Sequence, residues 1–161
     1  MKRLFLSGMA AAATLTGISA AQETRPALTS ASAKAIVAGC EAYALEKGWK
    51  LNITVLDQGR NLMAFLRMDD ALLGTIEISQ WKANASASFA GPTKGSAERA
   101  KEFPALAAAP NIAIFEGGEA IFSKDGVPLG GVGVSGAAGS EDAECARAGI
   151  AKAGLRHDRP E

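Results

Sequence analysis

Charged side chains gather at a bend that follows an alternating apolar segment. Arg67, Met68 and Asp69 place a cation beside an anion there, and such junctions often carry binding residues. The same two charges could instead form a local ion pair that stabilises the bend. Lys82 follows in an apolar helical pattern, where its ammonium group either meets the carboxylate of a ligand or reaches solvent. The pattern indicates a small-molecule site and leaves the ligand open.

Three carboxylates, those of Asp57, Asp69 and Glu116, are candidates for acid–base chemistry on a small organic acid. A serine or cysteine nucleophile would need a buried histidine as its base. The one histidine, His157, lies in a charged C-terminal tail, where it is at most a candidate metal ligand. Whether the chain is an enzyme is therefore left open.

Two cysteines, Cys40 and Cys145, are the only sulfhydryl groups of the chain, and each lies within a predicted helix. Their spacing from each other and from His157 is not that of a zinc site. In an oxidising compartment such a pair tends to form a disulfide. The alternative is two buried free thiols, because cysteine packs well as a small apolar residue.

Residues 1–21 have the three parts of a secretory signal. Lys2 and Arg3 form the positive start, a mostly apolar stretch follows, and Ser19-Ala20-Ala21 supplies the small residues before a cut at Gln22. A retained membrane anchor is disfavoured, because polar residues interrupt a stretch that would need about 20 strongly apolar residues. We expect a periplasmic or secreted protein that has no membrane span after cleavage.

The mature chain, residues 22–161, has the size of one domain. The full sequence has 17 basic and 17 acidic residues, and losing Lys2 and Arg3 leaves 15 basic against 17 acidic. A charge of about −2 gives no support for nucleic acid or an anionic membrane as a partner.

Hydrophobic periodicity predicts helices and strands in an order that is typical of an α+β protein. The expected helices are 29–47, 75–89 and 140–154, with a helical turn in the long connection 93–110. The expected strands are 49–56, 61–67, 111–115, 120–123 and 127–134. Short turns between successive strands favour antiparallel pairing, which makes one five-stranded antiparallel sheet covered by helices.

Glycines are concentrated between Gly130 and Gly139, but the spacing is not that of a phosphate-binding loop. Glycines within a strand usually mark a bulge or the close approach of another backbone or a ligand. Together with the bend at Arg67, this stretch is predicted to frame a cavity for a flat or acidic ligand.

Several segments, taken in order, resemble the GlcG/HbpS-like family of haem-binding or haem-degrading proteins, which is related to the C-terminal domain of PduO. The segments are Val55-Leu56-Asp57-Gln58-Gly59, Phe65-Leu66-Arg67-Met68-Asp69, Ser79 with Lys82-Ala83 and Ala85, Gly117-Gly118, Asp125-Gly126, Gly130 to Gly136, and Asp142 to Ala146. The resemblance covers nearly all of the mature chain.

This resemblance implies a profilin-like or PAS-like fold, a homo-oligomer, and haem as the ligand, with slow haem breakdown and iron release in some members. The candidate ligand-binding residues are Arg67, Met68, Asp69, Lys82, Glu116, Gly117 and Gly118. No histidine lies in the matched region, so the axial ligand is open, with Met63, Met68 and His157 as candidates.

Three functions follow from these observations. The first is an exported haem-binding oligomer, with Arg67 or Lys82 near the haem propionates. The second is a carrier or sensor of another small organic ligand, and the third is an enzyme that acts on a small organic acid.

Overall fold

A computed structural model describes residues 24–160 of the chain. The predicted signal peptide, residues 1–21, lies outside the described residues. The elements in order are α1 (Ser30–Lys47), β1 (Asn52–Asp57), β2 (Leu62–Arg67), α2 (Thr75–Phe89), α3 (Thr93–Glu102), the 3-10 helix η1 (Pro104–Ala108), β3 (Gly118–Phe122), β4 (Pro128–Ser135) and α4 (Gly139–Lys152). This order confirms the predicted α+β class.

The described strands form one antiparallel sheet in the order β2-β1-β4-β3. It has four strands rather than the five predicted, because residues 111–115 do not pair with it. Asn111 has a left-handed backbone conformation with a φ of 59°, and the Ala113 N–H donates to the Trp81 carbonyl at 3.3 Å. This segment therefore satisfies its backbone partly against α2, which the apolar pattern of a strand does not reveal.

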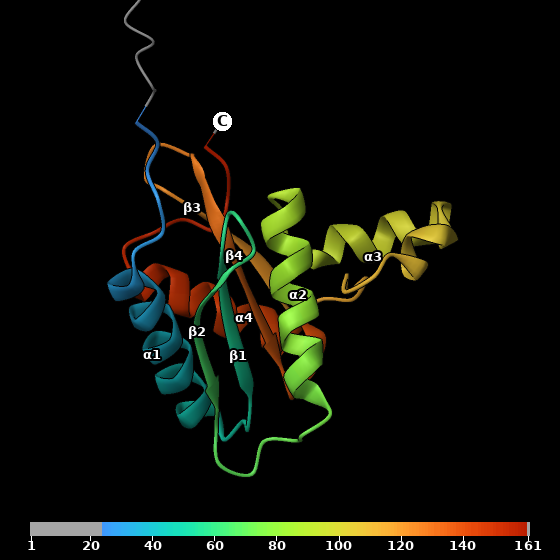
Figure 1. The fold of residues 1–161 in the computed structure, drawn as a ribbon. Coiled ribbons are helices and arrows are strands. Elements are labelled where there is room, and N and C mark those ends of the chain that lie inside the picture. Colours follow the sequence, from blue (N-terminus) through green and yellow to red (C-terminus); the bar gives the residue numbers. More distant parts are fainter. Residues whose placement is uncertain (1–23, 161) are drawn as a thin grey trace, which may run out of the picture.

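Helices α1 and α4 cover one face of the sheet side by side (Figure 1). The Thr29 side chain accepts a hydrogen bond from the Ser32 N–H at the start of α1, and Gly48 ends the helix in the left-handed region. Cys40 and Cys145 meet where the two helices cross, and their sulfurs are bonded. The predicted disulfide is thus present in the structure.

Helix α2 covers the opposite face of the sheet and lies directly on the glycines of β4 (Figure 1). A Cβ atom at Gly133 would collide with the Ser79 carbonyl and the Ala83 N–H of α2, and one at Gly131 would collide with the Ala83 carbonyl. The close approach predicted for these glycines is therefore to a helix backbone. They form no wall of a ligand cavity, because α2 already fills that space.

The long connection after α2 is more regular than the sequence suggested. It forms α3 and η1, which project away from the sheet (Figure 1). The C-terminal tail is also better ordered than its charged composition predicts, because Arg156 exchanges two backbone hydrogen bonds with Phe122 on the free edge of β3. No helix among the described residues is both long and apolar enough to span a membrane.

We predict that Gly133→Ala destabilises the fold by about 2–3 kcal/mol, because the added methyl group separates α2 from β4. Gly95→Ala in α3 is the matched control, since a Cβ there meets no atom within 4 Å. The control should change stability by less than about 1 kcal/mol, in the stabilising direction. Guanidinium unfolding curves compare the two, and equal effects would contradict the packing argument.

Candidate functional site

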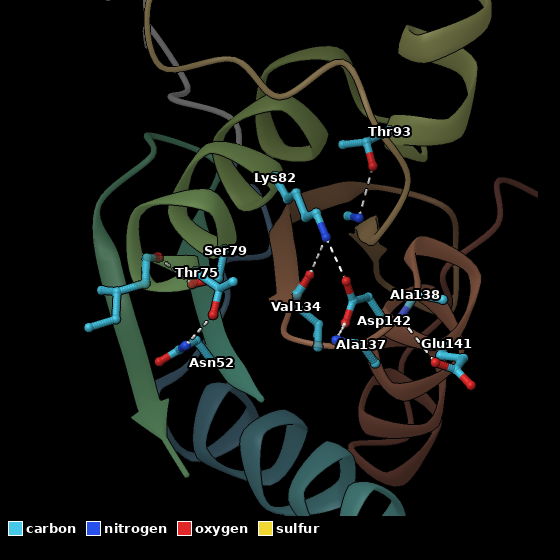
Figure 2. Close-up of polar contacts among 12 residues, drawn as sticks. Asn52, Thr75, Ser79, Lys82, Thr93, Val134, Ala137, Ala138, Glu141 and Asp142 are labelled. Carbon is cyan, nitrogen blue, oxygen red and sulfur yellow. Dashed lines mark hydrogen bonds and ion pairs between the residues drawn. The ribbon is translucent and has the colours of Figure 1, made fainter. Parts of the chain in front are cut away.

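A buried ion pair joins α2 to α4 near the C-terminal end of β4. The Lys82 Nζ atom lies 2.7 Å from the Asp142 Oδ2 atom and donates to the Val134 carbonyl at 2.8 Å. Both side chains are almost fully buried, with exposed fractions of 3% and 2%. Figure 2 shows the ammonium group reaching from α2 toward both partners. Two of the three N–H bonds of the ammonium group are thus used within the protein.

Local structure places each partner of this pair. Asp142 lies in the first turn of α4, where its Oδ1 atom accepts from the Ala137 N–H at 3.0 Å, while Glu141 accepts from the Ala138 N–H. Gly117 has a φ of 124°, and a Cβ atom there would collide with the Lys82 Nζ atom. Glycine at position 117 is therefore required both by its backbone conformation and by the lysine beside it.

Burial shifts both ionisable groups of the pair toward their neutral forms. Desolvation lowers the pKa of the Lys82 amine, and the nearby carboxylates of Asp142 and Glu116 offset this only in part. Desolvation likewise raises the pKa of the Asp142 carboxyl, against the opposing effects of Lys82 and the Ala137 N–H. A proton can therefore move between the two groups at lower cost than between the same groups in water.

This pair forms the floor of a cavity of about 350 Å³, which we call the Lys82 cavity. Its apolar rim includes Leu72 and Phe115, which are both exposed, so the cavity opens to solvent. The Lys82 Nζ atom lies 5.6 Å from the centre of the Phe115 ring. The other lining residues are Thr75, Ile78, Glu116, Ser135, Gly136, Ala137 and Gly139. The cavity is thus small and partly apolar, and a buried ion pair lies at its base.

A second cavity of about 410 Å³ lies on the other side of α2 and shares no lining residue with the first. We call it the Trp81 cavity. It is lined by Leu56, Arg60, Leu62, Gln80, Trp81, Asn84 and Asn111. Arg60 and Asn111 are two of the four non-glycine residues with positive φ among residues 24–160. Such backbone strain often accompanies a binding site.

The structure brings some of the predicted site residues together. Lys82 and Glu116 line the Lys82 cavity, and Gly117 and Gly118 pack behind it, where the Gly118 N–H donates to the Thr93 hydroxyl at 2.9 Å. The Lys94 ammonium lies 3.9 Å from the Glu116 carboxylate at the exposed side.

The charged bend lies apart from both cavities. Arg67 and Asp69 are exposed, whereas Met68 is buried and its N–H donates to the Leu51 carbonyl. None of these three residues lines the Lys82 cavity or the Trp81 cavity, and Arg67 and Asp69 form none of the ion pairs seen within residues 24–160. Of the predicted frame, Gly136 and Gly139 from the glycine stretch line the Lys82 cavity, whereas the charged residues of the bend do not.

The other candidates for chemistry are also dispersed. His157 follows the residue that pairs with Phe122, at the opposite end of β3 from Gly118. In residues 24–160 no group of three or more His, Cys, Asp or Glu side chains could hold a metal ion. Of the proposed acid–base carboxylates, Glu116 lines the Lys82 cavity, while Asp57 is held by the backbone and side chain of Asn61 and lies elsewhere.

Comparison with known proteins identifies the family of this chain. A family model described as "Haem degrading protein HbpS-like" matches residues 28–151. The chain belongs to the HbpS-like family. This confirms the resemblance that was inferred from the ordered sequence segments.

The relatives of this HbpS-like chain are similar over most of their length. Protein GlcG of Escherichia coli strain K12 is 37% identical over 114 residues, which are 70% of this chain and 84% of GlcG. A double mutant of Streptomyces reticuli HbpS superposes with a TM-score of 0.78 at 29% identity, covering 88% of this chain and 97% of that one. A complex of PduOC with heme has a TM-score of 0.76 at 21% identity, covering 83% and 100% of the two chains, which shows a shared fold alone.

Sequence reasoning missed three residues of the two cavities in this HbpS-like chain. Asp142 appears in the sequence analysis only within a segment that resembles the family, although an acidic residue in such a segment is a signal for a role in the site. Trp81 lies within the predicted helix 75–89, and Arg60 lies between the predicted strands 49–56 and 61–67. Nothing local in the sequence indicates that Arg60 and Trp81 line the same cavity, because this depends on where α2 lies relative to the β1–β2 hairpin.

We predict that Asp142→Asn destabilises the HbpS-like chain by about 3–5 kcal/mol, because it leaves the buried Lys82 ammonium without its counter-charge. Combining it with Lys82→Met removes both charges and keeps an acceptor for the Ala137 N–H, so the double variant should recover most of the loss. Urea unfolding measures both variants. A double variant as unstable as the single one would show that the pair itself is not what matters.

Proposed function

We propose that this chain is an exported, homo-oligomeric protein that binds haem. Membership of a family described as haem degrading supports haem as the ligand. The signal pattern of residues 1–21 supports export, and the Cys40–Cys145 disulfide agrees with an oxidising compartment. Exposed apolar side chains, among them Leu73 and Phe103, support contact between copies of the chain.

The two cavities differ in how well they suit a haem molecule, which is a flat apolar ring with two carboxylates. In the Lys82 cavity the lysine is already matched by Asp142, and Glu116 adds a second negative charge. A propionate gains little there, since it would meet no net positive charge. The predicted role of Lys82 beside a propionate is therefore not part of this proposal.

The Trp81 cavity offers the better match. Arg60 is exposed and takes part in none of the ion pairs found within residues 24–160, so its guanidinium is available to a carboxylate. The half-buried Trp81 ring, with Leu56 and Leu62, supplies flat and apolar walls. An unpaired cation beside an aromatic wall is the observation that carries the proposal. Its volume also falls in the range of small-molecule sites, about 300–1,000 Å³.

The side chains that line this cavity are suited to contacts with the propionates and ring faces of haem, and not to coordination of its iron. Its lining residues include no histidine, cysteine, methionine or tyrosine, which are the usual axial ligands. Bound haem would supply the iron at which its own breakdown and iron release occur, while Arg60 and Trp81 would hold and orient it. The same lining favours, as a second candidate, another planar organic acid that needs no metal ligation.

We predict that hemin added to the purified mature chain shifts its Soret band and saturates. Arg60→Ala should weaken the apparent affinity about tenfold, the loss expected when a charge-assisted hydrogen bond is removed. Arg67→Ala is the matched control, because Arg67 is an exposed arginine that lies outside both cavities. Equal weakening by the two variants would contradict a site at Arg60, and no spectral change at micromolar hemin would refute haem binding.

We predict that the chain purified from the exported fraction begins at Gln22, contains no free thiol and has more than one copy per particle. Intact mass spectrometry gives the first residue, a thiol titration under denaturing conditions tests the disulfide, and light scattering gives the particle mass. Retention of residues 1–21 would contradict cleavage, and a single-chain mass would contradict the oligomer.

A further inference from the structure

Haem binding at the Trp81 cavity leaves the Lys82 cavity without a role. At its base lies the amine of Lys82, whose side chain is only 3% exposed although it lines a cavity that opens to solvent. The amine is held by the Val134 carbonyl and the Asp142 carboxylate, which leaves one position on nitrogen for a group in the cavity. Figure 2 shows both partners approaching it from the side of β4 and α4.

We propose that Lys82 is a nucleophilic amine that binds small neutral carbonyl compounds, aldehydes foremost, as a reversible imine in the Lys82 cavity. Imine-forming lysines of proteins are commonly desolvated, because burial lowers the pKa of the amine. The Asp142 Oδ2 atom, 2.7 Å from Nζ, is a proton acceptor for this amine. The lowered pKa of the Lys82 amine and the raised pKa of the Asp142 carboxyl, both caused first by desolvation, agree with this geometry.

The reaction balances with these two side chains alone. The Lys82 ammonium gives a proton to Asp142, and the free amine attacks the carbonyl carbon, so that a C–N bond forms while the oxygen takes that proton back. Asp142 then moves a second proton from nitrogen to the hydroxyl oxygen. The C–O bond breaks, water leaves, and a protonated imine remains opposite the Asp142 carboxylate. No oxidant, reductant or metal is needed.

The lining of the cavity selects the class of carbonyl compound. Phe115, Leu72 and Ile78 make its rim apolar, and its volume of about 350 Å³ limits the ligand to a small molecule. Asp142 and Glu116 leave the lining with one more negative than positive charge, which disfavours 2-oxo acids. A short aliphatic aldehyde therefore fits better than a carboxylated ligand.

A second ion pair, in which only the carboxylate is buried, provides a comparison within this chain. The Arg147 Nη1 atom lies 2.6 Å from the buried Glu119 carboxylate, and this pair connects α4 to β3. Neither residue lines the Lys82 cavity or the Trp81 cavity. The Lys82–Asp142 pair differs because it faces a cavity, and because its cation is a lysine, which can lose a proton where arginine cannot.

Reductive trapping on the wild-type protein tests the proposal. The chain is incubated near neutral pH with submillimolar propanal and cyanoborohydride, and labelled peptides are identified by mass spectrometry. Lys94 is the internal control, because its exposed ammonium lies beside the same Glu116 carboxylate. Propylation of Lys82 should be about tenfold faster than that of Lys94. Equal or slower labelling of Lys82 would overturn the proposal.

Two further measurements separate an imine from general reactivity of lysines. Lys82→Arg keeps a cation opposite Asp142 and should remove the fast labelling, while Lys94→Arg should leave it unchanged. Pyruvate, an anionic carbonyl compound, should label Lys82 at least about tenfold more slowly than propanal. The comparison of Lys82 with Lys94 is made on the wild-type protein, so the test does not depend on whether either variant folds. Loss of hemin binding in Arg60→Ala concerns a separate cavity, so either proposal can fail alone.

Discussion

The close contact between α2 and β4 is the constraint on which the Lys82 cavity depends. Gly131 and Gly133 have no side chains, so the helix backbone lies against the strand at a distance that no larger residue permits. The same contact lets Lys82 reach past the sheet end to the Val134 carbonyl and to Asp142. With a larger residue in β4, the lysine would be displaced from its counter-charge and the shape of the Lys82 cavity would change.

The two cavities on either side of α2 have opposite electrostatic character. On one side the cation is matched and buried, so its chemistry is that of a proton-sharing pair. On the other side Arg60 is exposed, lines the same cavity as Trp81, and forms none of the ion pairs found within residues 24–160. One helix therefore lines two cavities, because residues 75, 78 and 82 face the first cavity and residues 80, 81 and 84 face the second.

The opposite face of the sheet has a stabilising role. The Cys40–Cys145 disulfide joins the first and last helices across a separation of 105 residues, which restricts the unfolded chain strongly. The pairing of Arg156 with Phe122 covers part of the free edge of β3. These two connections attach α1, α4 and the segment after α4 to the rest of the described fold.

Local pattern in the sequence determined the class of the fold, the bounds of α1, β2 and α2 to within a residue, and the family. Helix caps, alternation and turn residues act within a few positions of the chain, so they can be read without a structure. Lys82 and Glu116 were named as candidates from their charges and from the family resemblance. The absence of a strand at residues 111–115, the filling of the glycine stretch by α2, and the pairing of Lys82 with Asp142 were decided only by tertiary structure. Each depends on contacts between segments distant in sequence, and side-chain chemistry alone does not specify which segments meet.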